Sequence, residues 1–204
     1  MPTKIQLSVL VAFAAVLWFV ALLLGGADVS IALLKPYTLV VSALGGLLIC
    51  FDRWLWRSRV LAGWLIHRPD IAGTWLAALS PTGESHNEFQ TMAAYIAVRQ
   101  TYSSLSMRLY SEESSSELLS GQISRAQDGT FRIAAVYRNT PRISLQDISR
   151  THHGAMLMSI STGDQVTLSG HYWTDRLSVG EIQLTERRRK IADSHASARA
   201  LFAA

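Results

Sequence analysis

The stretch that decides the fold is LSGHYWTDRLSVGEIQLTERRRK, at residues 168–190. Apolar and polar residues alternate on both sides of a central turn, which is the pattern of two half-buried strands. Tyr172, Trp173 and Arg176 lie at the predicted turn, and four cationic residues at 187–190 follow the second strand. The stretch therefore predicts a β-hairpin with aromatic rings and an arginine at its tip.

From Pro69 onward the chain repeats this pattern: short segments of alternating apolar and polar residues are separated by Gly, Ser, Asn and Asp. An antiparallel meander of this length tends to close, because closure removes its exposed edges. We predict an all-β domain, an antiparallel β-barrel of about eight strands, with one long connection at 139–152 that covers an end or carries a helical turn. The predicted strands are 73–79, 90–101, 104–111, 117–124, 130–138, 153–160, 165–172 and 177–186.

The N-terminal third of the chain differs, because it contains two apolar runs. Residues 5–24 hold no charged residue, and at ~1.5 Å per residue this segment spans ~30 Å, the thickness of a hydrocarbon core. A second, shorter apolar run covers 37–51 and contains Gly45 and Gly46, and with interfacial residues on both sides the second helix extends over about 33–54. We predict a membrane α-helical hairpin. A cleaved signal peptide is the alternative, although its apolar region would be shorter and a small-residue cleavage site should follow.

The charges that flank these runs predict their orientation. Lys4 precedes the first run and four arginines within 53–68 follow the second, while the loop between carries one acidic and one basic residue. Basic flanks face the cytoplasm, so we expect both the N-terminus and the barrel to be cytoplasmic. The predicted organisation is a membrane hairpin with an interfacial linker at 1–66, a ligand-binding barrel at 67–190 and a C-terminal tail at 191–204.

Composition excludes several classes of function. The 204 residues carry a formal net charge of +4 without a dense basic stripe, so we expect no DNA or RNA polymer as a partner. The single cysteine, Cys50, excludes an internal disulfide and cysteine-rich zinc sites. His152 and His153 are adjacent on a predicted strand and point to opposite faces. With no catalytic motif in the chain, we expect no enzyme activity, no metal and no cofactor.

The candidate ligand-binding residues follow from the alternation. One face of each segment 96–102, 131–137 and 166–172 begins with apolar residues and ends at a tyrosine, which predicts a barrel sealed at one end and polar at the other. Aromatic rings can stack on bases at ~1–3 kcal/mol each, and arginines can pair with phosphates. The alternative is that the tyrosines are core residues and the arginines face solvent. The candidates are Gln100, Tyr102, Arg108, Tyr137, Arg138, Tyr172, Trp173 and Arg176.

The tripeptide Gly-Thr-Trp at 73–75 resembles the first strand of lipocalin-like barrels. In such barrels the tryptophan plugs one end and stacks against an arginine from the last strand. The resemblance implies that Trp75 and Arg187 form this pair, and it makes the expected barrel lipocalin-like.

A wider resemblance covers essentially the whole chain. Two apolar runs precede GTW, AAVYRNTPR at 134–142, HHGAMLMSI at 152–160 and the hairpin at 168–187. This order is similar to the two-transmembrane β-barrel effectors of cyclic-oligonucleotide-based antiphage signalling systems (CBASS). The most specific motifs are Y-x-N-x-P, at Tyr137, Asn139 and Pro141, and G-x-Y-x-x-x-R-x-x-x-G, at Gly170, Tyr172, Arg176 and Gly180.

The resemblance implies a function that we state as an expectation. The barrel would bind a cyclic dinucleotide made by a cognate nucleotidyltransferase, self-associate, and disrupt the bacterial inner membrane so that the infected cell dies. A cyclic dinucleotide presents two phosphates and two π faces, which suit arginine and aromatic groups. The rival functions are a membrane-tethered lipocalin-like carrier or sensor of an apolar ligand, and a structural membrane subunit with a filled barrel.

Overall fold

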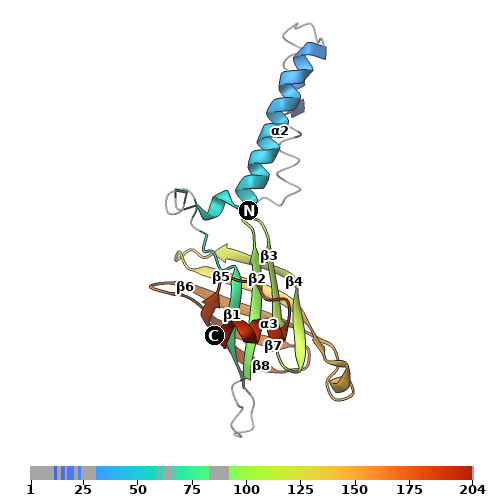
Figure 1. Cartoon of the computed structure of the whole chain (residues 1–204), viewed down its shortest axis with the longest axis vertical. Helices are drawn as coiled ribbons and strands as arrows, with labels where there is room; N and C mark the ends of the chain where they lie inside the picture. Colours follow the sequence, from blue (N-terminus) through green and yellow to red (C-terminus); the bar gives the residue numbers. More distant parts are fainter. Residues whose placement is uncertain are drawn as a thin grey trace. The chain divides into compact units, whose positions relative to one another are not determined.

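The computed structural model describes residues 31–58, 60–61, 66, 68–82 and 92–203, together with residues 12, 15–16, 18–20 and 23 (Figure 1). The chain divides into two compact units. The first comprises Met1–Ile66 with Thr101–Ser103, and the second comprises His67–Gln100 with Ser104–Ala204.

The described part of the first unit contains the helix α2 (Ile31–Arg53) and the short 3-10 helix η1 (Leu55–Arg57). The predicted span at 5–24 lies largely outside the described residues, and the predicted span at 33–54 falls on α2. Within the described residues, no helix combines the length and apolar character that crossing a membrane requires.

The second unit is a closed antiparallel barrel of eight strands in sequence order, in which β1 also pairs with β8. This architecture confirms the predicted barrel. The predicted 139–152 connection contains the 3-10 helix η2 (Ile143–Leu145), and the predicted tail contains the helix α3 (His195–Phe202). The strands are β1 (Gly73–Thr82), β2 (Met92–Gln100), β3 (Leu105–Tyr110), β4 (Ser114–Arg125), β5 (Phe131–Pro141), β6 (His152–Thr162), β7 (Val166–Thr174) and β8 (Val179–Arg188).

Strand direction gives the barrel two different ends. Each strand is antiparallel to its neighbours, so the carboxyl ends of the odd-numbered strands lie together at one end. That end, which includes Thr82, Pro141 and Thr174, is called the open end below. The opposite end, which includes Gly73 and Gln100, is called the closed end.

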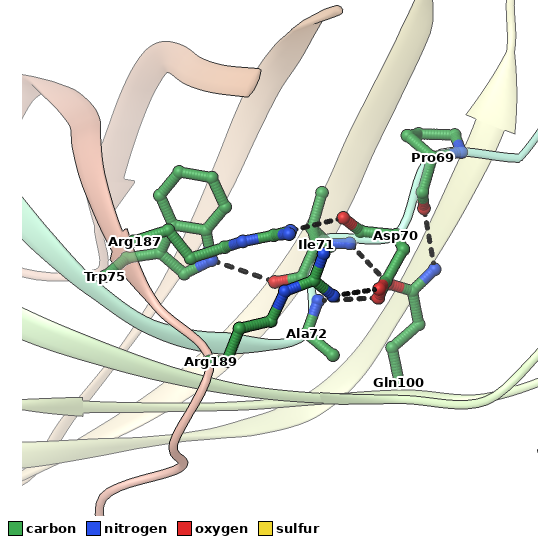
Figure 2. Close-up of polar contacts among 8 residues, drawn as sticks. All are labelled: Pro69, Asp70, Ile71, Ala72, Trp75, Gln100, Arg187 and Arg189. Atoms are coloured by element: carbon green, nitrogen blue, oxygen red, sulfur yellow. Dashed lines mark hydrogen bonds and ion pairs between the residues drawn. The ribbon is translucent and has the colours of Figure 1, made fainter. Parts of the chain in front are cut away.

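A tryptophan seals the closed end. Trp75 has no exposed surface, and its indole Nε1 donates a hydrogen bond to the carbonyl oxygen of Ile71 at 2.8 Å. The guanidinium carbon of Arg187 lies 5.5 Å from the centroid of the Trp75 ring, and Arg187 also donates to the Asp70 carbonyl (Figure 2). A cation over an indole face is attracted by the ring quadrupole, so the arginine holds the ring in place.

Gln100 completes this seal from β2. Its Oε1 accepts the backbone N–H of Ile71 at 2.9 Å, and its Nε2 donates to the Pro69 carbonyl at 3.0 Å (Figure 2). Arg189 pairs with the Asp70 carboxylate at 2.9 Å. These contacts satisfy buried backbone groups of the segment that precedes β1, which would otherwise cost free energy.

The segment after β8 is attached to the outside of the barrel. The Thr74 hydroxyl donates to the Lys190 carbonyl at 2.7 Å and accepts from the Ala192 N–H at 2.8 Å. Ser194 caps α3, and Phe202 stacks on Tyr95 of β2 with 5.5 Å between ring centroids.

Candidate ligand-binding site

The open end of the barrel contains a cavity of about 240 Å³. Its floor is apolar and its upper wall is polar. The floor residues include Ile96, Met107, Leu109, Leu118, Met156 and Ile182, and the polar residues include Ser111, Ser114, Ser116, Asn139, Thr174 and Ser178. The volume is somewhat below the ~300–1,000 Å³ of typical small-molecule pockets, so a ligand larger than the cavity would extend into the mouth.

Two tyrosines line the cavity because strand alternation turns them inward. Tyr137 of β5 lies opposite Gly154 of β6, and Tyr172 of β7 lies opposite Gly180 of β8. A methyl group built at Gly180 would lie 2.6 Å from the Tyr172 hydroxyl oxygen, and one at Gly154 would collide with the Tyr137 ring. Each ring therefore occupies space that only glycine leaves open, and this fixes its position in the wall.

Both tyrosines line the cavity, and neither hydroxyl group has a hydrogen-bond partner among the described residues. Burial raises the pKa of Tyr137 to about 12, with smaller contributions from the nearby Tyr172 and Asp175. Burial also raises the pKa of Tyr172. Both groups remain protonated at neutral pH, so both can donate a hydrogen bond to a ligand.

Further hydroxyl groups form pairs around the upper wall. Ser116 Oγ donates to Asn139 Oδ1 at 2.9 Å, which leaves the Asn139 amide nitrogen as a donor with no partner among the described residues. The hydroxyl oxygens of Thr174 and Ser178 are 2.6 Å apart. The wall therefore offers many neutral donors that rotate to suit a ligand.

Arg176 lies at the mouth of this cavity, in the turn between β7 and β8. Its guanidinium donates to Ser149 Oγ at 2.8 Å and lies 3.4 Å from Nδ1 of His152, which lines the cavity. The next residue, Leu177, has a φ of 59°, in the left-handed region that leucine rarely adopts. Such a conformation persists where the surroundings enforce it, here the bonds that close the turn between Thr174 and Ser178.

Asp175 is the acidic residue of the same turn. It accepts the backbone N–H of His153 at 2.9 Å, and this bond, together with the charges of His152 and His153, lowers the pKa of its carboxyl group. The turn thus presents one anion and one cation at the mouth.

The structure brings together only three of the eight predicted ligand-binding residues: Tyr137, Tyr172 and Arg176. Gln100 lies at the closed end, because β2 runs toward that end while β5 and β7 run toward the open end, and Tyr102 belongs to the first unit. Gln100 binds the segment before β1, and the Tyr102 ring lies 5.0 Å from the Phe51 ring within the first unit.

The other three predicted residues lie on the outer face of the barrel. Arg108 and Arg138 both pair with Glu117, the first at 3.1 Å, and the hydrogen bond from Arg138 is the main cause of the lowered pKa of Glu117. Trp173 is a residue of β7, which ends at Thr174, and not part of the turn. Strand alternation turns its side chain outward, and it is 40% exposed.

The cavity also contains residues that sequence reasoning missed. The serines at 111, 114 and 116 belong to a run whose alternation with Leu118 marks an inward face, and Asn139 belongs to the Y-x-N-x-P motif. Among the described lining residues none is Arg or Lys, and the only ionisable groups besides the tyrosines are Glu117 and His152.

Comparison with known protein families gives a match over most of the barrel. A family model described as Cap15, cyclic dinucleotide receptor domain, matches residues 66–186, a range that includes β1 to β7 and most of β8. No curated protein matches the chain.

Proposed function

The chain belongs to the family of Cap15 cyclic dinucleotide receptor domains, and on this premise we propose that it is an antiphage effector whose cavity at the open end binds the dinucleotide. One observation carries the placement of the ligand. Tyr137 and Tyr172, whose protonated hydroxyls have no protein partner among the described residues, line a cavity with a polar upper wall.

The chemistry of the site suits the two halves of such a ligand. Bases can pack on the apolar floor and against the rings of Tyr137 and Tyr172. Phosphate oxygens can accept hydrogen bonds from the hydroxyl groups of the upper wall, and from the guanidinium of Arg176 if they extend to the mouth. The cavity of about 240 Å³ supports this division. A ligand larger than the cavity extends into the mouth, where its phosphates stay near solvent.

The remaining steps of the proposal concern signalling. A cognate nucleotidyltransferase would supply the cyclic dinucleotide, and the bound state would favour self-association, since a ligand shifts an equilibrium through its different affinity for two states. The uncharged run at 5–24 and the apolar run at 33–54 support an anchor in the bacterial inner membrane. Confinement to a bilayer raises the effective concentration of the barrels, and the gathered anchors would then disrupt the membrane. No catalytic step is part of the proposal.

A second candidate function is a membrane-tethered carrier or sensor of an apolar ligand. The observation that favours it is the composition of the cavity wall, which has an apolar floor and no Arg or Lys among its described residues. The two functions differ in what they bind, so one titration separates them.

The test is a calorimetric titration of the full chain in detergent with a panel of cyclic dinucleotides and, separately, with a fluorescent fatty acid. We expect saturable binding of at least one cyclic dinucleotide and none of the fatty acid. The reverse result would support the carrier and reject the receptor.

A pair of arginine variants tests the placement of the ligand at the mouth. Arg176→Ala removes a charge-assisted hydrogen bond and should weaken cyclic dinucleotide binding about 10- to 100-fold. The matched control is Arg132→Ala on the outer face of β5, where the side chain pairs with Asp128 at 3.6 Å. Equal affinities for both variants and the parent would contradict the contact with Arg176.

A further inference from the structure

The outer face of the barrel carries an apolar row that crosses four strands. Val136, Ala155, Trp173 and Val179 are directly paired neighbours on β5, β6, β7 and β8. Val136, Trp173 and Val179 are 45%, 40% and 47% exposed, and Leu157 in the adjacent row is 43% exposed. The solvent face of an antiparallel sheet normally carries polar residues, and contiguous exposed apolar residues mark interaction surfaces.

We propose that this surface, the β5–β8 face formed by these five residues, is where two copies of the chain associate. This inference rests on the proposed function for the role of the ligand. Trp173 is the largest member of the face, and tryptophan is a frequent anchor of protein interfaces. The eight strands form a closed barrel, so a partner cannot add a strand to an edge and must pack on a face.

The charges beside the row favour a second copy as the partner. On one side, Asp175 lies 3.5 Å from His153, which is paired in register with Arg138. On the other side, His171 is paired in register with Glu181. Each side of the row therefore carries an acidic side chain next to an imidazole.

Such a pattern is self-complementary. In a twofold dimer the same surface meets itself, so acidic groups of one copy can lie against the imidazoles of the other. Anionic lipid surfaces and nucleic acids instead attract clusters of Lys and Arg. The described residues that border this row do not form such a cluster, and two of them are acidic.

The backbone connects the β5–β8 face to the ligand cavity. Each member of the central row has sequence neighbours that line the cavity or lie beneath a tyrosine ring. Tyr137 follows Val136, Tyr172 and Thr174 flank Trp173, and Ser178 precedes Val179. Ala155 lies between Gly154, under the Tyr137 ring, and Met156 in the cavity floor.

The tight packing of the tyrosines on glycine makes this connection stiff. The rings have no free space toward the backbone at Gly154 and Gly180, so a ligand that presses on either ring must move the strand beneath it. Packed protein interiors transmit such displacements. Ligand binding inside the barrel would thus adjust the outer row and promote association.

The experiment uses the full chain in detergent with a cyclic dinucleotide from the panel. Calorimetry measures ligand binding, and sedimentation velocity measures association with and without ligand. Val136→Lys places a charge in the centre of the face, and Ser106→Lys, on the outer face of β3, is the matched control. We expect Val136→Lys to bind the ligand as the parent does and to weaken association about tenfold or more, while the control associates normally.

A second measurement does not require the folded barrel to accommodate a new charged side chain. In a Cys50→Ser background, Ala155→Cys should form a disulfide between copies under mild oxidation, faster with ligand, and Ser106→Cys should not. Normal association of Val136→Lys, or no cross-link through Ala155→Cys, would overturn the proposed surface. Failure of the parent chain to bind any cyclic dinucleotide would instead overturn the proposed function.

Discussion

At the scale of single residues, the site depends on tyrosines that are packed against glycines. Tyr137 is 8% exposed, and its ring lies over Gly154, which explains why the chain has a glycine opposite a tyrosine in the middle of a pair of long strands. Sequence reasoning identified Tyr137 and Tyr172 from their chemistry. It could not identify the glycines as their supports, because the two residues of each pair lie on different strands.

The buried hydroxyl predicts a pH dependence of stability. The pKa of Tyr137 is about 12 in the folded chain and about 10 when unfolded. The unfolded chain therefore loses this proton first as the pH rises, and about 2–3 kcal/mol of stability, intact below pH ~10, is lost as the pH passes through ~12. Tyr137→Phe lacks this contribution.

Urea unfolding of the parent and Tyr137→Phe at pH 9 and pH 12 measures the difference. We expect the free energy of unfolding to fall less in the variant. An equal fall in both chains would show that the native pKa of Tyr137 is not raised.

At the scale of strands and turns, the alternation of residues predicted the number of strands and most of their faces. The prediction was wrong about which end of the barrel each strand runs toward. Segment 96–102 ends in polar groups just as 131–137 does, but β2 and β5 run in opposite directions, so their polar ends lie at opposite ends of the barrel. Gln100 ends the second strand of the meander, and even-numbered strands run toward the closed end. The strand's number in the sequence would therefore have placed Gln100 there. Counting strands therefore adds information that periodicity alone lacks.

This placement predicts a structural role for Gln100. Gln100→Ala leaves the Ile71 N–H and the Pro69 carbonyl without their partner, which should lower the free energy of unfolding by about 1–3 kcal/mol. Gln183→Ala, on the exposed face of β8, is the control and should change it by less than about 0.5 kcal/mol.

Ligand titration of the same variants distinguishes the two interpretations of Gln100. Its position at the closed end predicts that cyclic dinucleotide affinity is unchanged in Gln100→Ala. A loss of affinity without a loss of stability would favour the ligand contact that the sequence suggested.

At the scale of the whole molecule, the proposed function depends on the association of several copies of the chain. Each of the two units contributes its own contact between copies. The second unit supplies the cavity and the β5–β8 face. The first unit contains α2, where a Cβ built at Gly45 or Gly46 would meet no atom of another described residue within 4 Å outside the helix's own backbone, and where Leu44 and Leu47 are exposed among the described residues. If the proposed membrane anchoring holds, small residues would allow two copies of α2 to pack closely, and this contact belongs to the proposal.

The double variant Gly45→Leu, Gly46→Leu tests this contact. It should bind cyclic dinucleotide as the parent does, since the barrel is unchanged, but it should be less toxic to cells that produce the ligand. Leu44→Phe, which enlarges an already large side chain on α2, is the control. Equal toxicity of the double variant and the parent would exclude close packing through these glycines.

The sequence by itself determined the features that depend on neighbouring residues. The period of two predicted the strands, and GTW together with Arg187 predicted the ring and cation pair that the structure shows at the closed end. The membrane hairpin stays a prediction. Membership of the cavity was decided only by the tertiary structure. Antiparallel pairing and barrel closure determine which strand ends meet, and these long-range relations place Tyr137, Tyr172 and Arg176 together while turning Arg108, Arg138 and Trp173 outward.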